Sequence, residues 1–171
     1  MVGKILEEIK ASLLNVDLHE ASYEVNGYHL SVEAQKGNTP DIAKFFKDRA
    51  FYLEDLFCID YVDYLELVYF FNRYKELCRV KVTLRVDADK PVAPTISTIY
   101  TMARWYERET HEFFGVYFDG HPSLTYLFLH DGIDHYPLRK KPVPVSEEAK
   151  KLLNSYKPEE EDDAFFVNLG P

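Results

Sequence analysis

Residues 77–86 read LCRVKVTLRV, and this stretch gives the clearest indication of the fold class. From position 79 onward, polar side chains alternate with apolar ones, which is the pattern of a strand with one buried and one polar face. Residues 56–64 and 65–74, directly before it, are dense in Tyr, Phe, Val, Leu and Ile, which favour strands. Short turns at Asp63-Tyr64 and near Lys75 predict that these three strands are antiparallel neighbours.

Helical patterns flank the predicted strands on both sides. Apolar residues at positions 5, 6, 9 and 13 predict an amphipathic helix over residues 4–14. Thr39-Pro40-Asp41 supplies a cap, a first-turn proline and an acid for a second helix that runs to about Arg49. Apolar residues at intervals of three and four from Ile96 to Tyr106 predict a third helix, which carries Trp105. Helices packed on an antiparallel or mixed sheet make an α+β domain.

The remaining sequence is predicted to be less regular. Residues 23–32 alternate around Asn26-Gly27, a pair that tolerates positive φ, and predict a β-hairpin. Residues 87–94, with two prolines, predict a loop. Beyond Gly115, scattered glycines and prolines predict an irregular, extended segment. We therefore divide the chain into an α+β domain, residues 1–116, and a docking segment with an acidic tail, residues 117–171.

The last part of the chain carries two further features. A short exposed helix is expected over residues 146–156. Five consecutive acids at 159–163 then precede the apolar residues Ala164-Phe165-Phe166-Val167. We expect this tail, residues 159–171, to be a second attachment to a partner or simply solvated.

Composition places the chain among globular proteins. Its 171 residues suit one main domain, and 46% hydrophobic with 29% charged residues excludes both a disordered and a membrane-embedded chain. No apolar run approaches the roughly 18–20 residues that a bilayer crossing needs. A net charge of −9 repels phosphate backbones, so nucleic acid is not an expected partner.

Residues able to bind a metal or a cofactor are sparse. Cys58 and Cys78 form no CxxC pair, and the histidines lack the spacing of a zinc site, so we assign no metal ligand. Cys58 lies in an apolar run and is expected to be buried. Neither a GxGxxG nor a GxxxxGK[ST] loop is present, so nucleotide binding lacks its usual sequence motif.

The acidic cluster around Arg108 has two interpretations. Glu107, Glu109 and Glu112 would suit acid–base catalysis by paired carboxylates. Glu and Arg at neighbouring helix positions more often form solvated or interfacial ion pairs without a catalytic role. We expect the second arrangement and assign no catalytic residue.

Residues 105–122 read WYERETHEFFGVYFDGHP and resemble the signature of the 30 kDa subunit of respiratory complex I, the C subunit family of NADH-quinone oxidoreductases. Residues 137–140, PLRK, are similar to a second block of that family, and Asp60-Tyr61 falls in its order upstream. The resemblance covers roughly positions 40–145, which is far more specific than a single short motif. The candidate interface and motif residues are Trp105, Glu107, Arg108, Glu109, Glu112, Phe114, Gly115, Phe118, Gly120, His121, Pro122, Tyr126, Phe128, Pro137, Leu138, Arg139 and Lys140.

The chain departs from the usual complex I pattern at several positions. Glu112 stands where Asp is usual, and residues 123–126, SLTY, replace an acid, a leucine and two arginines. His135-Tyr136 stands where Gly-His is common, and Lys141 stands where an acid is common. With these departures the chain resembles the branch of the family found in energy-converting membrane-bound nickel-iron hydrogenases and related archaeal sulfur-reducing complexes.

The resemblance implies a peripheral-arm subunit without a cofactor or an active site of its own. Its expected partners are a large catalytic subunit, with a nickel-iron centre or a quinone pocket, and a small iron-sulfur subunit. The complex would couple ferredoxin oxidation and proton reduction to ion translocation. The chain would lie at the cytoplasmic face of the cell membrane, attached only through the complex. The alternatives are the same subunit in an NADH- or other donor:quinone oxidoreductase or a sulfur-reducing complex, and an independent soluble enzyme that uses the carboxylates of residues 107–112.

Residues 118–144 are expected to form the main docking surface for the large subunit, because apolar side chains occur there in a stretch unsuited to a core of its own. Aromatic residues would supply binding energy, and Arg139 with Lys140 would pair with acids of the partner. These aromatic residues are Tyr117, Phe118, Tyr126 and Phe128. The alternative is that the segment folds back on its own sheet.

Overall fold

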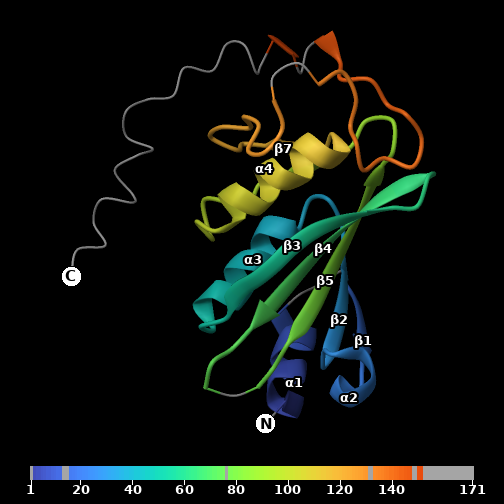
Figure 1. Ribbon diagram of the computed structural model, residues 1–171. Coiled ribbons are helices and arrows are strands. Elements are labelled where there is room, and N and C mark those ends of the chain that lie inside the picture. Colours follow the sequence, from blue (N-terminus) through green and yellow to red (C-terminus); the bar gives the residue numbers. More distant parts are fainter. Residues whose placement is uncertain (1, 13–15, 76, 131–132, 148–149, 152–171) are drawn as a thin grey trace.

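The computed structural model describes residues 2–12, 16–75, 77–130, 133–147 and 150–151 (Figure 1). In chain order its helices and strands are α1 (Val2–Ser12), β1 (Asp17–Glu20), α2 (Tyr23–Asn26), β2 (Leu30–Ala34), α3 (Thr39–Asp48), β3 (Tyr52–Asp60), β4 (Tyr64–Asn72), β5 (Val80–Asp87), β6 (Val92–Pro94), α4 (Ala103–Phe114) and β7 (Tyr117–Asp119). None of these helices combines the length and the apolar character that a membrane crossing requires.

Five strands form one mixed sheet in the order β1-β2-β5-β4-β3. β3, β4 and β5 are antiparallel neighbours, as their short turns predicted, and Leu67 lies opposite both Cys58 and Leu84. β2 runs parallel to β5, and β1 runs antiparallel to β2. This sheet with its helices confirms the predicted α+β class.

The core lies on one face of the sheet. Alternate residues of β4 and β5, at 65, 67, 69 and 71 and at 80, 82, 84 and 86, are buried there with residues of α1, α3 and α4. Phe46 of α3 stacks on Phe71 with ring centroids 4.9 Å apart and meets Phe51 edge-on at 5.0 Å. Burying one such side chain stabilises the fold by about 1.5–3 kcal/mol. Cys58 belongs to this core, as expected, and burial raises the pKa of its thiol to about 12.

α4 connects the sheet to the last part of the chain. It packs next to β3, and the segment that follows β7 runs over the side of α4 away from the sheet (Figure 1). β6 and β7 form a separate two-stranded parallel sheet, in which Ala93 lies opposite the fully buried Phe118. The prediction of a loop over residues 87–94 is therefore wrong in part, and the irregular segment predicted beyond Gly115 begins with the short strand β7.

Two further local predictions are wrong. Asn26-Gly27 ends α2 instead of turning a hairpin: Gly27 has φ +72°, its N–H donates to the Tyr23 carbonyl, and β2 pairs with β1. The third helix starts at Ala103 and not at Ile96. Ile96 sits in preceding turns, where its carbonyl accepts two backbone N–H groups, so apolar spacing of three to four also fits consecutive turns.

The element boundaries differ slightly from those predicted. α1 is confirmed, and α3 begins at Thr39 with Asn38 as its N-cap, which makes no side-chain capping bond. The Thr39 hydroxyl donates instead to the Gln35 carbonyl at 3.3 Å, so Thr39 is not the cap. In the predicted helix over residues 146–156, the described residues 147, 150 and 151 are helical and Ser146 is not, while residues 148–149 and 152–156 and the acidic tail lie outside the described residues.

Candidate functional site

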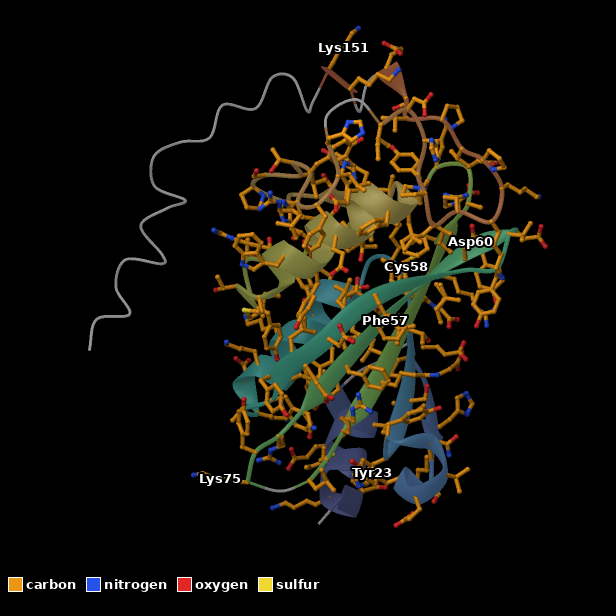
Figure 2. All side chains as sticks on the ribbon, in the orientation of Figure 1. Tyr23, Phe57, Cys58, Asp60, Lys75 and Lys151 are labelled. Carbon is orange, nitrogen blue, oxygen red and sulfur yellow. The ribbon has the colours of Figure 1, made fainter. Side chains whose placement is uncertain are left out.

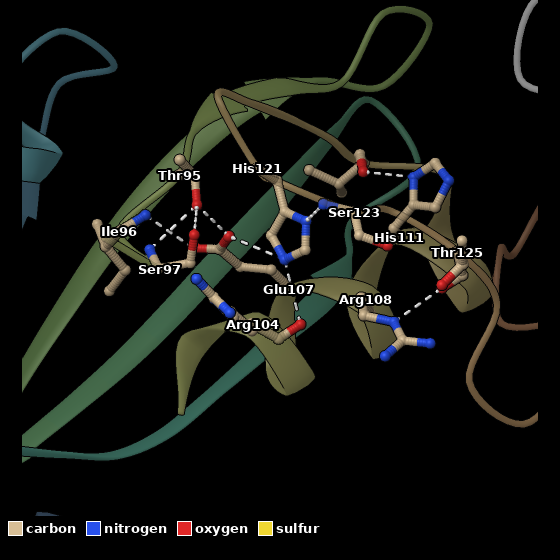
Figure 3. Close-up of polar contacts among 11 residues, drawn as sticks. Thr95, Ile96, Ser97, Arg104, Glu107, Arg108, His111, His121, Ser123 and Thr125 are labelled. Carbon is tan, nitrogen blue, oxygen red and sulfur yellow. Dashed lines mark hydrogen bonds and ion pairs between the residues drawn. The ribbon is translucent and has the colours of Figure 1, made fainter. Parts of the chain in front are cut away.

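α4 directs its charged side chains into different surroundings. Glu107 and Glu112 are fully buried, Arg108 is half-buried and Glu109 is exposed. Positions 108 and 112 are one helical turn apart, so they share the face covered by the segment after β7. Glu107 points instead toward the loops that follow β6 and β7 (Figure 3).

The Glu107 carboxyl group is bonded to the loop after β6. Its Oε1 accepts the Ile96 N–H at 2.8 Å, and its Oε2 accepts the Thr95 hydroxyl. The Thr95 Oγ1 in turn accepts the Ser97 N–H at 3.0 Å. Burial raises the pKa of Glu107 to about 7, although these bonds act in the opposite direction. The expectation that Glu107 forms a solvated or interfacial ion pair with Arg108 is therefore wrong.

His121, which follows β7, lies beside this carboxyl group (Figure 3). Its Nδ1 accepts the Ser123 N–H at 3.0 Å, so Nε2 carries the proton and donates to the Arg104 carbonyl at 3.2 Å. Burial lowers the pKa of His121 to about 4. Its Nε2 is 3.9 Å from Glu107 Oε2, so a neutral imidazole and a carboxyl group are in contact at neutral pH.

Arg108 and Glu112 bind the backbone of residues 125–128, and we call these two side chains the clasp. Arg108 donates from Nε and Nη2 to two successive carbonyl oxygens, at residues 125 and 126, over 3.0 Å each. The Glu112 carboxylate accepts the next two N–H groups, of Leu127 and Phe128, the latter at 3.1 Å. The cation therefore meets carbonyl oxygens and the carboxylate meets N–H groups.

The end of α4 requires glycine at position 115. Gly115 has φ +78°, and its N–H donates to the His111 carbonyl at 2.8 Å. A Cβ at this position would lie 2.6 Å from a ring carbon of Tyr136. The buried His111 Nδ1 donates to the Val116 carbonyl at 2.9 Å, which ties the helix end to the next residues.

A buried ion pair joins the end of β3 to the PLRK block. Arg139 Nε lies 3.2 Å from Asp60 Oδ2, with both side chains almost fully buried at the end of the sheet (Figure 2). Arg139 also donates to the carbonyls of Phe114 at 3.2 Å and Ala88 at 2.8 Å. Burial alone would raise the pKa of Asp60, but backbone hydrogen bonds, including that from Lys140, and the Arg139 charge hold it below its usual value.

Accessible chemistry is sparse at this site. Within the described ranges, no three His, Cys, Asp or Glu side chains are grouped so that they could bind a metal ion. Glu107 and Glu112 are both bonded to this chain's own backbone, so they do not form the accessible pair that acid–base catalysis needs. The geometry therefore gives no support to an independent enzyme that uses residues 107–112.

The motif residues of α4 and of the segments that they bind also mark a family. A profile of the family described as the respiratory-chain NADH dehydrogenase 30 Kd subunit matches residues 32–148, well over half of the chain. The chain belongs to this family. It is accordingly a complex I-type 30 kDa subunit of an oxidoreductase complex.

Known proteins and solved structures match most of the chain. The C subunit of the NADH-quinone oxidoreductase of Roseiflexus sp. (strain RS-1) is 30% identical, over 84% of this chain and 84% of its own. The C/D 2 subunit of the Aquifex aeolicus NADH-quinone oxidoreductase is 31% identical, over 79% of this chain and 23% of its own. A chain of the membrane-bound sulfane sulfur reductase, an archaeal respiratory membrane complex, superposes with a TM-score of 0.73. That match covers 92% of this chain and 96% of the other at 23% identity, and it shows a shared fold.

Two residues that the 30 kDa subunit resemblance marked for docking lie inside the fold. Phe118 is fully buried in the core, so its side chain is not part of a docking surface. Arg139 is paired with Asp60, so the expectation that it pairs with acids of a partner is wrong. At these two residues, segment 118–144 packs on its own domain, as the alternative predicted.

Apolar side chains nevertheless remain outside on this segment. Phe128 is 67% exposed and Leu138 is 54% exposed. The Phe128 ring stacks near Phe113 with centroids 6.3 Å apart, and the Leu138 N–H donates to the Phe113 carbonyl at 3.2 Å. We call these three residues the Phe128 patch.

The other motif residues are exposed or partly buried. Trp105 is half-buried, with the Arg108 guanidinium 5.2 Å from its ring. Phe114 packs against the core, Tyr126 is half-buried, and Gly120 has φ +81° in the turn before His121. The exposed members are Glu109, Gly120, Pro122, Pro137 and Lys140.

Sequence reasoning missed three residues that organise the site. The resemblance places Asp60 only in the family's order, although an acid that ends an apolar strand before a turn is a usable signal. Nothing in the sequence marks Thr95 as a partner of Glu107, because a hydroxyl in a turn is usually solvated. Nothing marks Tyr136 either, because its contact with Gly115 depends on how the segment after β7 crosses α4.

Proposed function

We propose that the chain is a non-catalytic scaffold subunit in the peripheral arm of a membrane-bound, complex I-related oxidoreductase, where segment 118–144 docks on the large catalytic subunit. The observation that carries this proposal is the Phe128 patch. Its Phe128 and Leu138 side chains are exposed beside the half-buried Phe113, and the buried Glu112 carboxylate holds the backbone at Phe128 in place. Exposed apolar side chains gathered on an ordered loop are typical of protein–protein contacts.

The partner follows from the fused relative. The Aquifex aeolicus protein carries C and D in one name, and this chain matches only 23% of its length. Two subunits joined in one chain in a relative are expected to be neighbours in a complex. A D-type large subunit is therefore the proposed partner, together with a small iron-sulfur subunit.

The parent complex is proposed to be of the membrane-bound nickel-iron hydrogenase type, with ferredoxin oxidation and proton reduction coupled to ion translocation. The departures at residues 123–126 and 141 support this branch. The chain shares its fold with a chain of the archaeal sulfane sulfur reductase, so a sulfur-reducing complex stays a candidate as well. In this arrangement the chain lies at the cytoplasmic face of the membrane and is attached through its partners. The second candidate is a donor:quinone oxidoreductase. The sequence identity of 30% with the C subunit of the Roseiflexus sp. NADH-quinone oxidoreductase favours it.

Purification of the tagged chain from membranes of its source organism tests the scaffold function. A large subunit and a small iron-sulfur subunit should co-purify. Stoichiometric nickel with hydrogen production from reduced ferredoxin would establish the hydrogenase type, whereas quinone or sulfur reduction without nickel would establish an alternative. Elution of the chain without partners from both membrane and soluble fractions would refute the proposal.

Variants of the exposed patch test the docking surface. Phe128→Ala and Leu138→Ala should reduce co-purification of the large subunit without lowering the melting temperature of the free chain. Tyr74→Ala is the matched control, since Tyr74 is an 85% exposed aromatic residue beside Lys75, at the end of the sheet away from Asp60 (Figure 2). Equal co-purification of all three variants would place docking elsewhere.

A further inference from the structure

We propose that Arg108 and Glu112 are positioning residues for assembly: they fix the backbone of residues 125–128 in advance, so that Phe128 enters an apolar pocket of the large subunit. This inference rests on the proposed function and deepens it, because it names the side chain that leads the contact and the residues that present it.

The first support is the match between the clasp and the backbone that it binds. Residues 125–128 offer two carbonyl oxygens and then two N–H groups to α4. Arg108 and Glu112, one helical turn apart, supply a cation for the carbonyl oxygens and an anion for the N–H groups. Each of the four bonds is charge-assisted, which makes it stronger than a bond between neutral groups. Four consecutive backbone positions are therefore fixed by two side chains.

The second support is the contrast in burial between the Glu112 carboxylate and the side chain that it positions. This carboxylate is fully buried, and an ionised group is placed in such a position only when bonded groups compensate for the lost water. Phe128, whose N–H it binds, is 67% exposed. The buried Glu112 carboxylate thus fixes the backbone of a residue whose aromatic side chain stays exposed. This arrangement buries no additional apolar surface in the free chain.

The third support is the physical effect of such an arrangement on binding. A loop that becomes ordered only on contact loses its conformational entropy during association, and a loop ordered beforehand does not. Aromatic side chains on a rigid backbone are frequent centres of binding energy, provided that the partner offers a fitting pocket. The clasp therefore acts through Phe128 and not by touching the partner.

The occupant is an apolar pocket of the D-type large subunit. The fused Aquifex relative supports this choice of partner. A second copy of this chain or a soluble protein would be a different occupant, and both are excluded if the free chain stays monomeric and binding requires the large subunit.

A double-mutant cycle tests the positioning role. The complex is purified without this subunit from a deletion strain, and its affinity is measured for the wild-type chain, Glu112→Gln, Phe128→Ala and the double variant. Gln keeps the shape of Glu, but it has only one accepting oxygen for two N–H groups, so release of the loop is expected. We expect Glu112→Gln to weaken binding about tenfold, Phe128→Ala to weaken it at least as much, and the double variant to match Phe128→Ala alone.

Hydrogen exchange on the free chain provides an independent reading. The amides of Leu127 and Phe128 should exchange about tenfold faster in Glu112→Gln. Glu33→Gln is the control, because Glu33 is an exposed carboxylate on β2, outside the candidate interface residues, and should leave affinity and exchange unchanged. If Glu112→Gln does not fold, Arg108→Lys replaces it in the cycle, since Lys keeps the charge but loses the two-pronged bond to the carbonyl oxygens.

The outcomes separate this inference from the proposed function. Additive effects of Glu112→Gln and Phe128→Ala, or an unchanged affinity of the Glu112 variant, would overturn the positioning role and leave the docking surface intact. An unchanged affinity of Phe128→Ala would overturn the docking surface itself. A non-additive cycle with faster exchange at residues 127 and 128 supports both.

Discussion

Replacing Glu107 with Gln should make the protein more stable than the wild type above pH 7. Gln is neutral at every pH and fits the same partners: its oxygen accepts the Ile96 N–H, and its amide donates to Thr95 Oγ1. Thr95 then donates to Ser97 Oγ, which lies 2.7 Å away. The variant thus reproduces the protonated form of the buried carboxyl group.

The sign and the magnitude follow from the pKa of Glu107. Burial raises this pKa from 4.5 to about 7, so the folded state holds a proton that the unfolded chain releases earlier. Stability from this group is fully present below pH 4.5 and is lost as the pH rises through about 7. Each unit of difference between the pKa of the folded and the unfolded state corresponds to about 1.4 kcal/mol, so the rise from 4.5 to about 7 amounts to about 3 kcal/mol. The stability of Glu107→Gln relative to the wild type should therefore rise by this amount between pH 4.5 and 8.

His121 opposes Glu107 in the wild type. Burial lowers its pKa from 6.5 to about 4, so its contribution is present above pH 6.5 and is lost as the pH falls through 4. Between about pH 4.5 and 6.5 the folded state binds one more proton at Glu107 and one fewer at His121, so the two slopes cancel. The Glu107→Gln variant lacks the contribution of Glu107 and keeps that of His121, so its free energy of unfolding should decrease as the pH falls from 6.5 to 4.

Urea unfolding of both proteins at pH 4.5, 5.5, 6.5, 7.5 and 8.5, followed by Trp105 fluorescence, measures this difference. Comparing the two proteins at each pH cancels the other titrating groups. Glu33→Gln, an exposed carboxylate on β2, controls for the loss of one charge. Parallel stability curves for the wild type and Glu107→Gln would refute the reasoning.

Three further predictions concern groups fixed by the same fold. Arg139→Ala should lower the free energy of unfolding by about 3–5 kcal/mol, measured in urea, because it leaves the buried Asp60 charge without its partner. Gly115→Ala should lower it by about 2 kcal/mol or more, through the strained positive φ and the contact with Tyr136; adding Tyr136→Ala should remove part of that loss. Cys58 should resist a thiol reagent at pH 8 in the native protein and react in urea, because burial raises its pKa to about 12. Equal modification rates in both states would contradict the buried position.

The core strands could be predicted from sequence because their burial is periodic. Alternation over residues 79–86 reports which side chains face the core, and the structure buries 80, 82, 84 and 86. The prediction of a hairpin at Asn26-Gly27 was wrong because a positive φ suits both a hairpin turn and a helix C-cap. The prediction that the third helix begins at Ile96 was wrong because consecutive turns and a helix share the same apolar spacing.

The motif residues of α4 could be found by resemblance, but their roles could not. Glu107, Arg108 and Glu112 stand within six positions of one another, which suggests a shared ionic cluster. Each is instead bonded to a different backbone segment, at residues 95–96, 125–126 and 127–128. Helix spacing tells which residues share a face, and only the path of the neighbouring chain tells what that face meets.

Linear patterns were enough to establish the α+β class, the three antiparallel strands, the burial of Cys58 and the family. These properties depend on local periodicity and on short motifs, which the order of residues records directly. The folded chain was needed for the parallel pairing of β2 with β5, the buried Glu107 and the Asp60–Arg139 ion pair, whose members are 79 positions apart. Such contacts form because packing removes water from polar groups and each must find a partner within reach, and that reach is set by the folded backbone.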